Sequence, residues 1–217
     1  MTNSKRSKKA SSKSGPPRDP THPPTDLLTL PQLADSLGIK GADLILCGDG
    51  SGSTWQLGCG WACLIFERAS GARYLTLGGM NLGSVNLAEL MAYTHALTWW
   101  HATRGLDMLH RKGRLSVHII TDSQLTVNLG MQVAAEQPLP APNRAYWAAM
   151  REMQRTGFFM HWHHVHRNLS YGNWLCDLVS SEARRAAMGI RDLLVDADGQ
   201  VLSLVEPPPP VGTTVSS

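Results

Sequence analysis

Four acidic side chains stand where an apolar segment ends or is interrupted, and these residues are the best placed in the sequence to do chemistry. Asp49 and Asp122 each follow an apolar run typical of a buried strand. Glu89 lies near the start of a segment with helical periodicity, and Asp177 lies inside a later one. Converging carboxylates raise one another's pKa, and a divalent cation with oxygen ligands removes that cost. Since two such ions can activate water and stabilise a leaving oxygen, the pattern indicates metal-dependent phosphodiester hydrolysis.

Each acid also has a purely structural interpretation. Asp49 stands in a Gly-rich stretch where Asp-Gly is an ordinary turn pair. Asn86 and Glu89 have the spacing of a helix capping box, and Asp122, between a strand and a helix, is a natural N-cap. Asp177 lies too deep in its helix to be a cap, so a solvated helix face is the alternative there. Taken together, however, four such acids favour a common site.

The elements that must position these acids follow from the periodicity of the sequence. Apolar or alternating stretches predict strands, and amphipathic spacing predicts helices. The predicted strands cover 44–47, 59–66, 73–77, 115–120 and 158–165, and the predicted helices cover 86–101, 123–129, 143–156 and 172–188. The first three strands are expected to form an antiparallel meander. We therefore predict an α/β fold in which a five-stranded mixed sheet is flanked by helices.

The two ends of the chain differ in composition from this central part. Residues 1–25 are rich in Lys, Ser and Pro and predict a disordered basic tail. We expect 26–41 to be a short helical segment or linker, 42–190 the catalytic domain, and 191–217 an extension with a Pro-rich tail. The first twenty residues carry a net charge of +5 and the whole chain +3, so the remainder carries −2. A generic basic nucleic-acid binder is therefore excluded for the globular part.

The cysteines and the apolar runs indicate in which cellular compartment the protein is expected. Cys47, Cys59, Cys63 and Cys176 form no Cys-x-x-Cys pair, and we expect them to be buried free thiols. No apolar run reaches the roughly 18 residues of a membrane span, and no apolar segment follows the basic N-terminus as in a signal peptide. We expect a monomer located in the cytoplasm.

Four short motifs, on the expected elements and in the same order, resemble the type 1 ribonuclease H family. They are Asp49-Gly50-Ser51, Asn86-Leu87-Ala88-Glu89-Leu90-Met91-Ala92, Thr121-Asp122-Ser123-Gln124 and Gly172-Asn173-Trp174-Leu175-Cys176-Asp177-Leu178. The likeness spans about residues 42–187. It implies a ribonuclease H-like fold and an endonuclease that hydrolyses the RNA strand of RNA–DNA hybrids, leaving 5′-phosphate and 3′-hydroxyl ends.

The resemblance also implies roles for individual residues. Two Mg²⁺ ions, with Mn²⁺ as a substitute, would be held by Asp49, Glu89, Asp122 and Asp177. The positions that would contact the nucleic acid are Gly50, Ser51, Asn86 and Gln124. The two amides suit this role, because amides can bond base edges and the 2′-hydroxyl that distinguishes RNA from DNA.

A catalytic-loop histidine before the last helix is implied as well. His166 is the leading candidate, although its spacing to Asp177 is about one residue off the commonest family pattern, and His164 is the alternative. Alternate residues of a strand share a face, so His161 and His163 oppose this pair, and a four-histidine metal site is not expected. We interpret His161 and His163 as ordinary strand residues.

The chain departs from the family in the region that grips the hybrid. Residues 133–143 contain no Lys or Arg, whereas some members carry a basic, Trp-rich protrusion there. The grip is therefore expected from the basic N-terminal tail or from the segment 104–114. Two other functions stay open: a nuclease or integrase of the same fold that acts on DNA, and a non-catalytic nucleic-acid-binding module. The two amides favour a hybrid substrate over DNA, and the presence of all four acids favours an enzyme.

Overall fold

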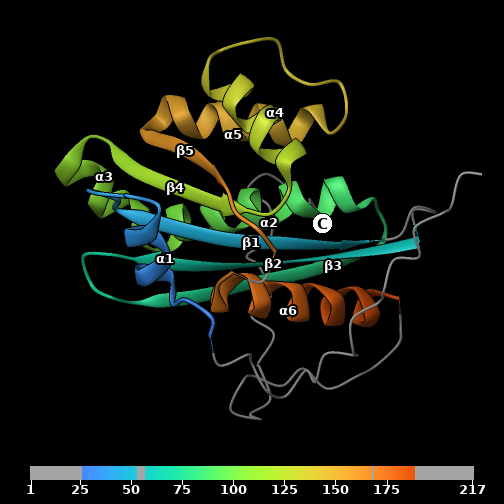
Figure 1. Ribbon diagram of the computed structural model, residues 1–217. Helices are drawn as coiled ribbons and strands as arrows, with labels where there is room; N and C mark the ends of the chain where they lie inside the picture. The colour runs from blue at the N-terminus through green and yellow to red at the C-terminus, as the bar shows by residue number, and fades with distance from the viewer. Residues whose placement is uncertain (1–25, 53–56, 168, 189–217) are drawn as a thin grey trace, which may run out of the picture.

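A single five-stranded sheet forms the centre of the computed structural model, which describes residues 26–52, 57–167 and 169–188 (Figure 1). The strand order is β3-β2-β1-β4-β5. The strands are β1 (Leu44–Gly52), β2 (Leu57–Glu67), β3 (Arg73–Leu82), β4 (Leu115–Thr121) and β5 (Phe158–His164). β1 to β3 are antiparallel, whereas β1 and β4 and then β4 and β5 are parallel. The predicted α/β fold with a five-stranded mixed sheet is therefore confirmed.

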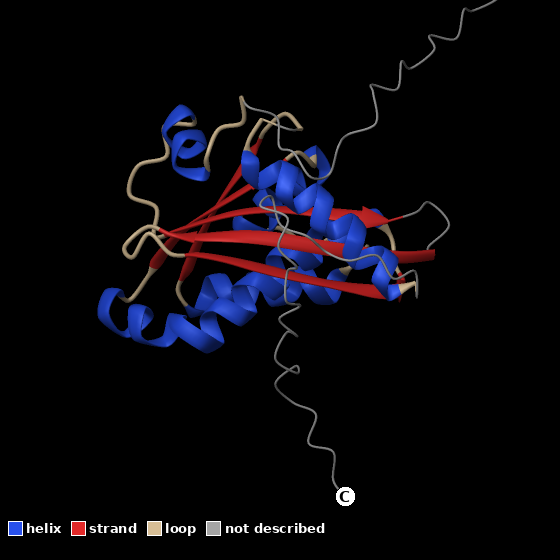
Figure 2. Cartoon of the chain, turned by 90° about the horizontal axis from the view of Figure 1, so that it is seen from below, coloured by secondary structure: helices blue, strands red, loops and turns tan. Residues whose placement is uncertain are grey.

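Helices cover both faces of this sheet, as Figure 2 shows. They are α1 (Leu30–Ser36), α2 (Val85–Trp100), α3 (Leu106–Lys112), α4 (Gln124–Ala134), α5 (Arg144–Thr156) and α6 (Tyr171–Ala187). α2, α4 and α5 lie on one face, and α6 and α1 lie on the other. A π-helical turn over His101–Gly105 joins α2 to α3, and this turn and α3 are the elements that the periodicity did not predict.

The apolar run of β1 is continuous because its strand is buried on both faces. Leu44 and Leu46 belong to the core beneath α2, and Ile45 and Cys47 belong to the core beneath α6. All four cysteines are buried free thiols, as expected. β1 is thus a fully enclosed central strand, and the acid near its end has a fixed position.

The segment that precedes β1 is part of the packed structure. Thr29 caps α1 in a capping box with Gln32, and Leu33 is fully buried in the core beneath α6. Leu28 forms a β-bridge with Ser170, the residue that caps α6. No helix in the described part of the chain is long and apolar enough to cross a membrane. The predictions for 1–25 and for the extension from 191 onward lie outside the described residues.

Candidate metal centre

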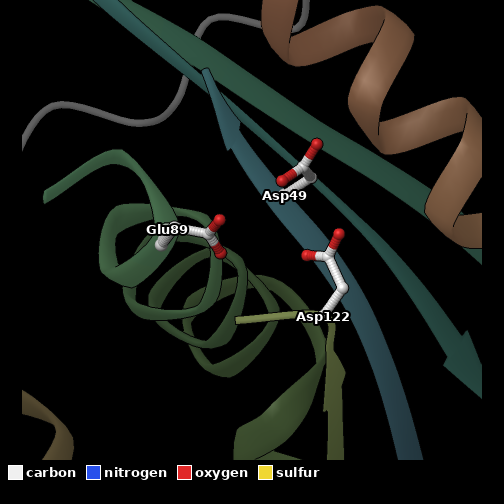
Figure 3. A group of neighbouring side chains, drawn as sticks. All are labelled: Asp49, Glu89 and Asp122. Atoms are coloured by element: carbon white, nitrogen blue, oxygen red, sulfur yellow. The ribbon is translucent and has the colours of Figure 1, made fainter. Parts of the chain in front are cut away.

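Three of the four predicted acids lie close together just beyond the point where the pairing of β1 with β4 ends (Figure 3). Asp49 comes from β1, Glu89 from α2, and Asp122 directly follows β4. One carboxylate oxygen of each lies within 4.8 Å of those of the other two. Together with Asp177 of α6, they line a cleft of about 270 Å³. Four separate elements therefore contribute acids to one cleft.

The register of the sheet explains why Asp49 and Asp122 meet. The last parallel pair between β1 and β4 is Cys47 with Ile120. Each acid stands two residues beyond its member of that pair, so the two side chains project from adjacent strands on the same side. A shift of one residue in either strand would turn one carboxylate away from the other.

Glu89 is not a capping residue. α2 begins at Val85 and is capped by Ser84, so Glu89 lies in the second turn and the capping-box interpretation of Asn86 and Glu89 is wrong. The helix reaches the strand because residue 50 is glycine. A Cβ added at Gly50 would lie 2.2 Å from the backbone nitrogen of Glu89. The missing side chain therefore lets α2 place its carboxylate over β1.

The structural interpretations of Asp49 and Asp122 are also wrong. Asp49 lies within β1, opposite Ala62 of β2, and not in a turn. The N-cap of α4 is Ser123, whose hydroxyl accepts a hydrogen bond from the backbone N–H of Thr126 at 3.3 Å. Neither carboxylate is therefore needed to terminate or start an element.

A buried tyrosine fixes α2 against both acid-bearing strands. The hydroxyl of Tyr93 lies 2.8 Å from the carbonyl oxygen of Gly48 and 3.0 Å from that of Ile120. These carbonyls precede Asp49 and Asp122 by one and two residues. Tyr93 thus positions the helix that carries Glu89 relative to the two strands.

The acids are held in an environment that opposes their ionisation. Burial, followed by the charges of Asp177 and Asp122, raises the pKa of Asp49 to about 7. Burial, followed by the charges of Asp49 and Asp122, raises the pKa of Glu89 well above its usual range. Glu89 Oε2 is buried and has no hydrogen-bond partner among the described residues. A cluster of oxygen ligands with an unpaired buried oxygen fits a hard divalent cation such as Mg²⁺ or Mn²⁺.

The fourth acid is bound to an arginine that sequence reasoning did not select. Arg167 Nη2 donates to Asp177 Oδ1 at 2.5 Å, and Arg167 Nε lies 3.7 Å from Asp122 Oδ2. Arg167 lines the cleft and lowers the pKa of both Asp49 and Glu89, so its guanidinium partly neutralises the site. The signal in the sequence was its position next to His166, in the loop that leads to the last helix.

The predicted histidines lie beside the acids and not among them. His166 is exposed and does not line the cleft. His164 Nε2 lies 3.2 Å from the backbone oxygen of Asp122. His164 is thus the last residue of β5 and lies next to Asp122, and His166 lies in the loop that follows.

The predicted contacts to nucleic acid fall into two groups. Gly50 and Ser51 line the cleft. Asn86 and Gln124 are exposed on the first turns of α2 and α4. Their helices start beside Glu89 and Asp122, so both amides stand close to the rim of the cleft.

The basic segment 104–114 lies at the other end of the sheet. Arg104 Nε donates to Glu67 at 3.1 Å, and Lys112 forms an ion pair with Asp43. Asp43 precedes β1 and is six residues from Asp49, which corresponds to about 20 Å along a strand. The paired side chains of this segment therefore do not reach the acids.

Comparison with known proteins gives structural likeness only. No family model matches the chain, and no curated protein matches it. A ribonuclease H1 isolated from compost by a metagenomic approach, LC11-RNase H1, matches with 21% identity and a TM-score of 0.52. The match covers 67% of this chain and 97% of that one. The fold is that of ribonuclease H.

Two further solved structures show weaker likeness. LC11-RNase H1 in complex with an RNA/DNA hybrid matches with 18% identity and a TM-score of 0.47, covering 66% of this chain and 98% of that one. Ribonuclease H1 from the archaeon Halobacterium salinarum matches with 17% identity and a TM-score of 0.46, covering 64% and 96%. The ribonuclease H fold itself rests on the first match and on the strand order.

Proposed function

We propose that this chain is a divalent-cation-dependent endonuclease that hydrolyses the RNA strand of RNA–DNA hybrids and leaves 5′-phosphate and 3′-hydroxyl ends. The observation that carries the proposal is the convergence of Asp49, Glu89 and Asp122, the first two of them buried, from three elements of a ribonuclease H fold. None of the three caps a helix or forms a turn, and their mutual repulsion destabilises the protein unless a cation offsets it. Repulsion between acidic side chains that lowers the stability of the fold in this way is typical of a functional site.

In this proposal Asp49, Glu89, Asp122 and Asp177 hold two Mg²⁺ ions, for which Mn²⁺ can substitute. When bound, the ions supply Lewis-acid chemistry for phosphodiester hydrolysis. The chain supplies the fixed frame, because the two acid-bearing strands share a register and Tyr93 holds α2 against them. Arg167 balances the charge of the carboxylates before the cations arrive.

The substrate preference is assigned to the rim of the cleft. Asn86 and Gln124 carry exposed amides that can bond base edges and the 2′-hydroxyl of the RNA strand. Gly50 and Ser51, which line the cleft, contact the same strand in this proposal. Because the globular part is not strongly basic, the N-terminal tail 1–25 contributes the grip on the phosphate backbone.

We assign the proton transfer to a histidine at the end of β5 or in the loop before α6. His166 is the proposed group, and His164, next to the backbone of Asp122, is the alternative. An exposed imidazole beside the cleft suits such a step, because histidine is the side chain that most often transfers protons in catalysis.

The proposal is tested by offering purified protein four labelled substrates of one sequence: an RNA–DNA hybrid, single-stranded RNA, duplex RNA and duplex DNA. With Mg²⁺ we expect cleavage of the RNA in the hybrid only, products with 5′-phosphate ends, and no cleavage after chelation. Cleavage of duplex DNA in place of the hybrid would assign the site to a DNA-directed nuclease. Binding without cleavage of any substrate, with Mg²⁺ or with Mn²⁺, would indicate a non-catalytic module.

A further inference from the structure

The carboxylate cleft contains a positively charged side chain at the point where its acids divide into two groups. Asp49, Glu89 and Asp122 each bring one ligand oxygen within 4.8 Å of the others, and among the described residues this close group does not include Asp177. The carboxylate of Asp177 instead accepts a hydrogen bond from the guanidinium of Arg167, at 2.5 Å. The cleft thus holds a group of three acids and, beside it, a fourth acid bound to an arginine.

The guanidinium of Arg167 bridges these two groups. Its Nη2 contacts Asp177, and its Nε lies 3.7 Å from Oδ2 of Asp122, which is one of the three clustered acids. A second cation held between Asp177 and the cluster needs the same carboxylate oxygens. The side chain of Arg167 and a second cation therefore compete for Asp177, whereas the three clustered acids can hold a first cation with Arg167 in place.

Arg167 is both charged and able to move. Burial alone would lower the pKa of Arg167, but the charges of Asp177, Asp49 and Asp122 raise it above its usual value, so the guanidinium stays positive. Its side chain is 58% exposed, against 22% for that of Asp177. Arg167 also stands in the loop between β5 and α6 and belongs to neither element. Because an ion pair with an exposed partner contributes little to stability, a divalent cation can displace this arginine from Asp177.

The chemistry of the guanidinium indicates which anion Arg167 binds once it is displaced. A guanidinium presents five N–H donors in a planar fork, and this fork fits two oxygens of one phosphate group. Arg167 lines the same cleft as Gly50 and Ser51, which contact the RNA strand in the proposed function. A backbone phosphate of the bound strand is therefore the anion that replaces the carboxylate of Asp177.

We propose that Arg167 holds the position of the second cation at Asp177, and that it transfers from this carboxylate to a backbone phosphate when nucleic acid binds. The inference rests on the two-cation nuclease function proposed above. Because the phosphate withdraws the guanidinium that competes for Asp177, nucleic acid and the second cation bind cooperatively. Linkage makes this coupling reciprocal, so each strengthens the binding of the other by the same factor. Arg167 thereby couples occupation of the fourth acid to the presence of substrate.

The first test is a titration of the metal-stripped full chain with Mn²⁺, in which the electron paramagnetic resonance signal measures the unbound ion and no nucleic acid is present. We expect two binding steps, the second weaker than the first. Arg167→Gln should strengthen the second step by at least about 5-fold, the lower end of the usual range for coupled sites, and should change the first step less. Arg111→Gln, which removes an exposed arginine from α3, should match the wild type. Circular dichroism checks that each variant is folded.

The second test repeats the titration with an excess of an RNA–DNA hybrid whose RNA strand is 2′-fluorinated, and gel electrophoresis checks that this strand stays intact. The hybrid should strengthen the second Mn²⁺ step of the wild type, and this effect should be larger than in Arg167→Gln by at least about 5-fold. Arg167→Lys keeps the charge that competes for Asp177 but lacks the planar fork. It should therefore keep the weak second step and show a smaller effect of the hybrid than the wild type.

Two results would overturn the proposal. One is a second Mn²⁺ step that is unchanged or weaker in Arg167→Gln, and the other is an equal effect of the hybrid on the wild type and on Arg167→Gln. Neither titration measures cleavage, so such a result leaves the outcome of the hybrid-cleavage assay untouched. Failure of hybrid cleavage, by contrast, would refute the proposed function and leave the competition between Arg167 and Mn²⁺ intact.

Discussion

Replacing Asp49 with asparagine removes one charge from the carboxylate cleft and leaves the shape of the side chain almost unchanged. Asp49 Oδ1 accepts a hydrogen bond from the backbone N–H of Gly50 at 2.8 Å, and an asparagine oxygen can keep that bond. The substitution therefore isolates the electrostatic cost of the site. In the absence of metal, we expect Asp49→Asn to be more stable than the wild type near neutral pH.

The size of this effect follows from the pKa of Asp49. A rise from the ordinary value of 3.8 to about 7 makes the ionised folded state less stable by up to about 4 kcal/mol. Because the folded pKa is raised, the wild type loses stability as the pH increases from about 4 to 7 and changes little above that. The difference between variant and wild type should therefore be near zero at pH 4 and largest above pH 7.

The assay is urea unfolding of both proteins with a chelator at a series of pH values, repeated with Mg²⁺. With Mg²⁺ the order should reverse, since a cation stabilises the folded wild type by mass action and the variant lacks one ligand charge. Asp107→Asn, which makes the same change on exposed α3, should leave stability nearly unchanged. If metal-free Asp49→Asn is less stable than the wild type at pH 7.5, the account of the cleft as a strained cation site is wrong.

Three further predictions concern residues that surround the carboxylates. Tyr93→Phe removes the hydroxyl that contacts the carbonyl of Gly48. We therefore expect the free energy of unfolding in urea to fall by about 1–3 kcal/mol, and hybrid cleavage to be slower. Arg167→Gln removes a positive charge that competes with the cation for the carboxylates. The Mg²⁺ concentration that gives half of the maximal thermal stabilisation should therefore fall, and an increase would contradict this role. Replacing both Asn86 and Gln124 with alanine should raise KM for hybrid and leave the fold intact, as checked by steady-state cleavage and circular dichroism; an unchanged KM would exclude them as substrate contacts.

The sequence was sufficient to predict the arrangement of the sheet and the meeting of the acids. The apolar runs around β1 and β4 have clear ends, and residues just beyond parallel strands must lie at the same edge of the sheet. The errors in local interpretation came from helix boundaries. A shift of the start of α2 to Val85 moves the cap from Asn86 to Ser84, and this frees Glu89 from a backbone role.

Features that depend on contacts across the sheet were not predictable in this way. The alternation along β5 correctly separates His161 and His163 from the histidines that follow. It cannot reveal that His118 stands opposite His161, because that neighbour is set by the register between β4 and β5. In the same way, no sequence pattern indicates that Arg167 points into the cleft and pairs with Asp177, because the loop between β5 and α6 has no periodicity.

The central claim is that the carboxylates in the cleft carry out metal-dependent cleavage of hybrid RNA. The most direct measurement is the rate of cleavage of a labelled RNA–DNA hybrid, under single-turnover conditions with saturating Mg²⁺, by the wild type, Asp122→Asn and Asp107→Asn prepared in parallel. We expect Asp122→Asn to be slower by at least about 100-fold, the upper end of what the loss of a ligand's outer partner costs, while still binding the hybrid. Asp107→Asn should match the wild type. Equal rates for the wild type and Asp122→Asn would contradict the claim.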